Sequence, residues 1–113
     1  MLEHQFTLPA ILPEDALARA LDGATLIDLR KQPAVLTSGK RIRDSQYRDP
    51  FEFNHDDPLT RATGPLIMFC VHGHEVSQFA CALLMLHGRD VCYVIGGFEA
   101  LVTAGAPLKD IME

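Results

Sequence analysis

Residues 70–77, with the sequence CVHGHEVS, bring a thiol, two imidazoles and a carboxylate into one short segment. The segment follows an apolar run, PLIMF, and leads into QFACALLMLHG, whose composition is typical of a helix. A helix N-terminus offers unpaired backbone N–H groups and a partial positive charge, and both stabilise an anion. Cys70 lies directly before such a terminus, so its thiolate is the group that we expect to react.

The residues after Cys70 have the types that an anion-binding loop requires. Gly73 is in the middle of the loop, where a sharp bend or a positive φ is easiest for a residue without a Cβ atom. Ser77 supplies an N-cap or first-turn hydroxyl for the following helix. The expected binding loop consists of the backbone amides of Val71, His72, Gly73, His74, Glu75 and Val76.

Two other chemistries fit this pattern less well. Cysteine phosphatases use Cys-x5-Arg, but the position six residues after Cys70 is Val76, and the residue before it is Phe69 rather than His. Cys70, His72 and His74 form Cys-x-His-x-His, and such ligands bind zinc or copper. This spacing is shorter than that of structural zinc sites, so we expect no metal here.

Composition limits the class of protein. The 113 residues are 48% apolar and 22% charged, which predicts a single globular domain over residues 1–113. A net charge of −5 argues against nucleic acid or an anionic membrane surface as the main partner. No signal-peptide pattern and no membrane-spanning window is evident. Three widely spaced cysteines do not form a secreted disulfide framework, so we expect a reduced, cytoplasmic protein.

Short apolar segments alternate with helical segments along the chain. Helices are expected at 13–23, 77–87 and 96–105, and strands at 24–30, 45–47, 66–70 and 90–95. This alternation predicts an α/β fold, a small parallel β-sheet of about five strands flanked by helices. The functional crevice of such a sheet lies at the carboxyl ends of its strands, where DLR and Cys70 both fall.

The helix expected at 77–87 has an apolar stripe with helical spacing. The stripe consists of Phe79, Ala80, Leu83, Leu84 and His87, and Cys81 and Met85 widen it. A helix that is covered on most of its surface has a firmly held start, as a reactive loop requires. Because Cys81 lies on this helix and Cys92 lies inside an apolar strand, we expect both to be structural cysteines.

Three segments together resemble the rhodanese-type sulfurtransferases. LIDLR resembles the Asp-x-Arg strand end of that family, and CVHGHEVSQFACALL resembles the active-site loop and helix of its single-domain members. VIGGFEAL is similar to the Gly-Gly-aromatic closing motif, and the resemblance covers roughly residues 10–108. The stretches SGKRI and YRDPF, with CVHGHEVSQ, are similar to the rhodanese branch associated with chromate-resistance operons.

The resemblance implies a rhodanese-like fold and a persulfide cycle. Cys70 would take sulfur from a small donor or a protein persulfide, and pass it to a thiol or a cyanide-like acceptor. The loop amides would hold the persulfide anion, and neither a metal nor an organic cofactor is implied. Asp28 and Arg30, two residues apart on one strand and therefore on the same side, are expected to support the crevice.

The chain departs from the family pattern in the charges of its loop. Many members carry basic residues there, whereas this loop carries Glu75 and two histidines. A carboxylate repels an anionic donor, so we expect weak activity with thiosulfate. GKRI and Asp44–Ser45 replace the family's Gly-His-Ile and Gly-Ala, and Leu101 replaces the last aromatic residue. These changes affect the expected docking surface more than the sulfur chemistry.

Two other functions remain open at the level of sequence. The chain could be a non-catalytic sulfur-carrier or sensor module, in which Cys70 holds sulfur and turns over only with a protein partner. It could also be a metal-binding stress protein. Stoichiometric metal binding that is lost in Cys70→Ser and His72→Ala would favour that alternative.

Overall fold

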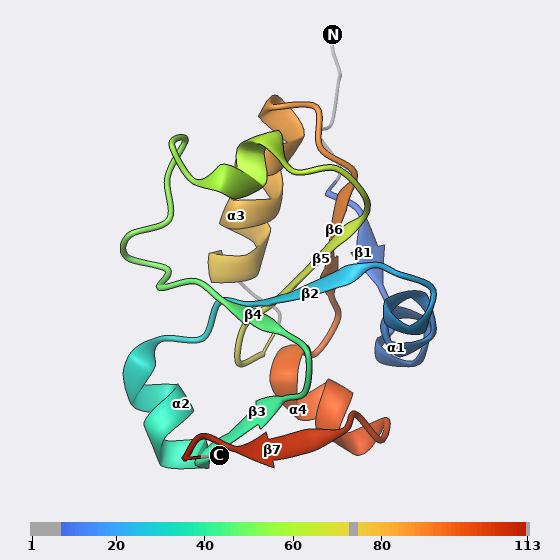
Figure 1. Ribbon diagram of the computed structural model, residues 1–113, viewed down its shortest axis with the longest axis vertical. Coiled ribbons are helices and arrows are strands. Elements are labelled where there is room, and N and C mark those ends of the chain that lie inside the picture. Colours follow the sequence, from blue (N-terminus) through green and yellow to red (C-terminus); the bar gives the residue numbers. More distant parts are fainter. Residues whose placement is uncertain (1–7, 73–74, 113) are drawn as a thin grey trace, which may run out of the picture.

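A five-stranded parallel sheet forms the centre of the computed structural model, which describes residues 8–72 and 75–112 (Figure 1). The strands lie in the order β1-β6-β5-β2-β4. Their bounds are Ala10–Ile11 (β1), Thr25–Asp28 (β2), Gln46–Tyr47 (β4), Leu66–Phe69 (β5) and Val91–Val94 (β6). The predicted α/β fold with about five parallel strands is confirmed.

Four α-helices and one 3-10 helix connect the strands. Their bounds are Pro13–Leu21 (α1), Gln32–Ser38 (α2), Glu75–Leu86 (α3), Gly97–Thr103 (α4) and Pro58–Arg61 (η1). The first helix begins at a proline with Glu14 and Asp15 in its first turn, a composition that suits a helix N-terminus. Figure 1 shows α3 and η1 on one side of the sheet and α1 on the other.

Side chains alternate across the sheet and create two cores. Leu26, Ile67 and Phe69 face a core that includes Ala16 of α1 and Leu101 of α4. Ile27, Leu66 and Met68 face a second core with Ala80 and Leu84 of α3. Because successive strand residues point to opposite faces, these runs of adjacent apolar residues are covered on both sides.

The register of the sheet positions the candidate site. β2 and β5 are direct neighbours, and Asp28 pairs with Phe69 at their carboxyl ends. The N–H of Leu29 donates to the carbonyl of Phe69 at 2.8 Å, so the two chains leave the sheet side by side. Consequently Arg30 and Cys70, which are far apart in sequence, emerge at the same edge of the sheet.

The predicted stripe on α3 is partly wrong. Ala80, Cys81, Leu83 and Leu84 are buried as expected, but Phe79 is 63% exposed and His87 is exposed as well. The helix also begins at Glu75, two residues earlier than predicted. The buried face is centred on Ser77, Ala80, Cys81 and Leu84, which follow the i, i+3, i+4, i+7 spacing. Phe79 falls at the edge of that face and extends toward a neighbouring loop.

Two strands of a small antiparallel sheet were not predicted. β3 (Lys40–Ile42) pairs with β7 (Leu108–Asp110), and Ile42 is opposite Leu108. The segment LKD carries no apolar run, so its pairing depends on a partner distant in sequence. The edge strand β1 was missed because a strand of two residues gives too short a sequence pattern to recognise. None of the helices in the described part of the chain is long and apolar enough to cross a membrane.

Candidate active site

Cys70 follows the last residue of β5 and is held by contacts with two helices. Its carbonyl accepts a hydrogen bond of 2.7 Å from the N–H of Phe98 in α4. Its Sγ donates to Oγ of Ser77, the third residue of α3, at 3.2 Å. The thiol is therefore fixed beside the first turn of a twelve-residue helix.

Ser77 can serve either protonation state of the thiol, because a hydroxyl both donates and accepts hydrogen bonds. It accepts from the S–H of Cys70, and it can turn its own O–H toward a thiolate. Ser77 is buried, so this contact is shielded from bulk water. The sequence predicted a first-turn hydroxyl at Ser77, and Ser77 lies in that turn, although not at the N-cap.

The Gly-Gly pair before α4 makes the second contact to Cys70 possible. Gly96 has φ 83° and Gly97 has φ 63°, and both values favour glycine. A Cβ atom at Gly96 would lie 2.7 Å from Cβ of Ala100, which is closer than van der Waals contact permits. The tight turn lets α4 begin where the N–H of Phe98 reaches the carbonyl of Cys70.

Arg30 is a buried structural cation. It forms an ion pair of 2.7 Å with Asp28, and both side chains are almost fully buried. The same guanidinium nitrogen, Nη2, also donates to the carbonyl of Lys40 at 2.9 Å, and the second terminal nitrogen, Nη1, donates to Oγ of Ser38 at 3.0 Å. Its Cζ lies 3.8 Å above the ring of Phe98. The charge is thus bound within the protein and ties the end of β2 to α2, β3 and α4.

An open cavity of about 520 Å³ lies in front of Cys70. Only 6% of Cys70 is exposed, and Cys70 is one of the residues that line this cavity. The ionisable side chains of Lys31, His72 and Glu75 line the same space. Arg30 lines it as well, with its guanidinium already in an ion pair, so two cations and one carboxylate lie near the thiol.

The structure brings most of the predicted site residues together. Val71, His72, Glu75 and Val76 line the cavity beside Cys70, while Gly73 and His74 lie outside the described residues. Asp28 is not one of the lining residues, but it pairs with Arg30, which does line the cavity. The inward orientation of the loop amides therefore stays a prediction.

Three lining residues were missed from the sequence: Leu29, Lys31 and Ala34. Lys31 matters most because it supplies the positive charge that the loop itself lacks. A signal for Lys31 was present in the sequence, since Lys31 comes three residues after the end of β2, and β2 neighbours β5 in the sheet. Residues that follow adjacent parallel strands meet at one edge of the sheet.

The other two cysteines lie in apolar cores. Cys81 is a fully buried residue of α3, and burial raises the pKa of its thiol to about 12. Cys92 lies in the core on the opposite face, and burial raises the pKa of its thiol as well. Both thiols therefore stay protonated and unreactive at neutral pH. All three cysteines are free.

Metal ligands do not gather in the described part of the chain, where no group of three His, Cys, Asp or Glu side chains is close enough to hold an ion. The pattern Cys-x-His-x-His includes His74, which lies outside the described residues. Its metal-binding alternative is therefore not tested by this arrangement.

A parallel sheet with a cysteine at a strand-to-helix junction fits a rhodanese-like domain, and sequence comparison identifies the family. The chain is 34% identical over 90 residues to thiosulfate sulfurtransferase GlpE of Pseudomonas fluorescens, covering 79% of this chain and 80% of that protein. It is 38% identical over 94 residues to the GlpE of Stutzerimonas stutzeri, with the same coverage. The chain belongs to the family of rhodanese-type sulfurtransferases.

A solved structure supports the fold. A rhodanese-related protein from Thermoplasma volcanium superposes with a TM-score of 0.67 at 20% identity, covering 89% of this chain and 97% of that chain. No family model matches the sequence.

Proposed function

We propose that this sulfurtransferase carries sulfane sulfur on Cys70 as a persulfide. In the first half-reaction, the Cys70 thiolate attacks the outer sulfur of a donor such as thiosulfate. A bond forms between Sγ and the outer sulfur, the donor's S–S bond breaks, and its electron pair leaves on sulfite. The products are Cys70–S–S⁻ and sulfite, so atoms and charge balance without a further oxidant.

The persulfide anion needs hydrogen-bond donors, and the start of α3 supplies them. The first turn of a helix has N–H groups without intrahelical partners, and they stabilise negative charge. The Ser77 hydroxyl accepts from the thiol at 3.2 Å, and once the sulfur is an anion its O–H can rotate and donate to it. Donors that are held in place before a reaction stabilise developing charge most effectively.

The second half-reaction returns the enzyme to its starting state. A nucleophilic acceptor, a thiolate or cyanide, attacks the outer sulfur of the persulfide. The S–S bond breaks, and its electrons return to Sγ of Cys70. The cavity of about 520 Å³ leaves room for donor and acceptor to enter in turn.

The position of Cys70 at the cavity is the observation that supports this proposal most directly. Cys70 alone among the three cysteines lines the cavity at the carboxyl edge of the sheet, and it touches the first turn of α3. A reactive cysteine is a thiol that is both accessible and placed near groups that stabilise its anion. The free state of all three cysteines fits a reducing compartment such as the cytoplasm.

Intact-mass spectrometry tests the proposal directly. After exposure to a sulfur donor, the protein should gain one sulfur atom, about 32 Da, and cyanide or dithiothreitol should remove it. Cys70→Ser should gain nothing, whereas the matched Cys81→Ala variant should load normally. Loading of Cys70→Ser to the wild-type extent would overturn the proposal.

Steady-state turnover separates an enzyme from a carrier. A sulfurtransferase that works alone forms thiocyanate continuously from donor and cyanide. A carrier or sensor module would load Cys70 once and would then need a protein partner to turn over.

A further inference from the structure

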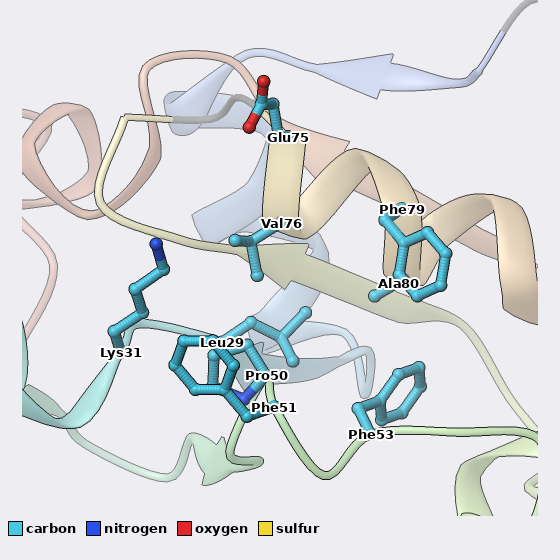
Figure 2. A pocket seen from close by; sticks show the side chains of 9 residues that line it. All are labelled: Leu29, Lys31, Pro50, Phe51, Phe53, Glu75, Val76, Phe79 and Ala80. Atoms are coloured by element: carbon cyan, nitrogen blue, oxygen red, sulfur yellow. The ribbon is translucent and has the colours of Figure 1, made fainter.

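A second hollow lies beside the Cys70 cavity, between α3 and the loop that follows β4 (Figure 2). We call it the phenylalanine groove, and its volume is about 270 Å³. Val76, Phe79 and Ala80 of α3 form one wall, and Pro50, Phe51 and Phe53 of the loop form the other. The groove is therefore apolar on both walls, which come from separate parts of the chain.

The groove adjoins the cavity in front of the thiol. Both hollows are lined by the same four residues, Leu29, Lys31, Glu75 and Val76, so the groove begins beside the space in front of Cys70. Lys31 and Glu75, the two ionisable residues among these four, lie at the junction of the two hollows. A molecule whose reactive end lies at Cys70 can thus extend its other end into an apolar space.

The burial of the lining residues gives the groove a floor and two rims. Leu29, Phe53 and Ala80 are 1%, 8% and 1% exposed, whereas Phe51 and Phe79 are 79% and 63% exposed. Exposed aromatic rings on both sides of a buried apolar floor are typical of a binding groove. The volume exceeds the roughly 150 Å³ of an apolar cavity that holds benzene, so an aromatic ring fits.

We propose that the phenylalanine groove binds the apolar substituent of an organic thiol that accepts sulfur from Cys70. The proposal rests on the function proposed above. The acceptor thiolate R–S⁻ attacks the outer sulfur of Cys70–S–S⁻, and a new S–S bond forms in R–S–S⁻. The bond between Sγ and the outer sulfur breaks, and its electron pair returns to Cys70 as the thiolate.

Lys31 and Glu75 both lie at the junction, and Lys31 is the group there that attracts a thiolate. The Nζ atom of Lys31 lies 5.7 Å from the centre of the Phe51 ring, and Lys31 lines both hollows. This ammonium group favours a thiolate that approaches Cys70. The groove beyond it offers no cation on either wall among the described residues, so an apolar group is favoured there over a charged one.

The test compares two acceptor thiols on the full-length protein. Cys70 is first loaded with inorganic polysulfide, excess donor is removed, and loss of about 32 Da is followed by mass spectrometry. Phenylmethanethiol and 2-mercaptoethanol are compared at equal thiolate concentration. Phenylmethanethiol should unload Cys70 about tenfold faster, since burial of an aromatic group stabilises its transition state.

Variants of the groove residues test whether the groove causes the preference for phenylmethanethiol. Phe51→Ala and Phe79→Ala should each reduce the preference for phenylmethanethiol at least about threefold, and should leave unloading by cyanide unchanged. Leu86→Ala is the matched control, because Leu86 is a 77% exposed apolar residue on the same helix as Phe79 and lies outside the groove. It should leave both thiol rates at their wild-type values.

The outcomes separate this inference from the function on which it rests. If Cys70 gains no sulfur from any donor, the persulfide function itself is wrong. If Cys70 loads and cyanide unloads it, but both thiols react equally fast, the groove does not bind the acceptor and this inference is overturned. An equal loss of preference in Leu86→Ala would overturn it as well.

Discussion

At the scale of single residues, side chains of opposite charge line the cavity in front of Cys70, the proposed nucleophile. Glu75 and Lys31 both line the cavity in front of Cys70, one from the start of α3 and the other from the segment after β2. An anionic donor is attracted by the ammonium group and repelled by the carboxylate. The balance between these two side chains therefore influences which donors load Cys70.

Glu75→Gln should raise kcat/KM for thiosulfate about three- to tenfold, because it removes a negative charge from the path of a dianion. Lys31→Gln should lower it by a similar factor. Steady-state thiocyanate formation at two ionic strengths measures both effects, and both should shrink at high salt. Glu99→Gln provides the control, since Glu99 is exposed in the first turn of α4 and does not line the cavity. Equal rates for Glu75→Gln and the wild type would exclude this role for Glu75.

At the scale of elements, Arg30 joins segments that are separate in the sequence. Its guanidinium bridges the end of β2, the last residue of α2, the first residue of β3 and the ring of Phe98 in α4. The same α4 donates the backbone hydrogen bond to Cys70. The position of the thiol thus depends on packing that the buried Asp28–Arg30 pair maintains.

Arg30→Met should lower the free energy of unfolding by about 3–5 kcal/mol, because it leaves the buried Asp28 carboxylate without its cation. The double variant Asp28→Asn/Arg30→Met should recover part of that loss. Urea denaturation measures both values.

Arg48→Met is the matched comparison for this prediction. Arg48 pairs with Asp57 at 2.9 Å, but the Arg48 side chain is 27% exposed. Breaking this partly solvated pair should cost about 1 kcal/mol or less. Equal losses for the two single variants would show that burial of the Asp28–Arg30 pair does not determine its contribution.

At the scale of the whole molecule, the stability of the fold should fall at alkaline pH. Burial raises the pKa of Cys81 from its ordinary 9.0 to about 12, and it also raises the pKa values of Cys92 and Tyr47. A group with a raised pKa in the folded state stabilises the fold fully below its unfolded pKa. That contribution is lost as pH rises through the folded value, here between about pH 9 and 12.

The free energy of unfolding should therefore decrease between pH 9 and pH 11, with Cys81 contributing on the order of 2–4 kcal/mol across its full titration. Urea midpoints at several pH values measure this decrease. Cys81→Ala loses stability at neutral pH because it leaves a cavity, but its further loss at alkaline pH should be smaller than that of the wild type. Parallel pH profiles for the two proteins would contradict this assignment.

Most of the sheet could be predicted because its elements have local signals. Thr25–Asp28 and Leu66–Phe69 are short apolar runs bounded by a glycine or a proline, and Gly96-Gly97 marks the turn before α4. The exposure of Phe79 could not be predicted in this way. Helical spacing locates an apolar face, but it does not show which residue at the edge of that face lies over a groove.

The sequence by itself determined that a cysteine stands between a buried strand and a helix, that such units alternate, and that the chain resembles rhodaneses. These features are local, because hydrophobic period, helix ends and turn glycines act over a few residues. Only the tertiary structure decided that Lys31 shares a cavity with Cys70, that β3 pairs with β7, and that Phe51 and Phe79 line the same groove. Those arrangements join segments distant in the chain, and they form only when burial of the two cores brings the segments together.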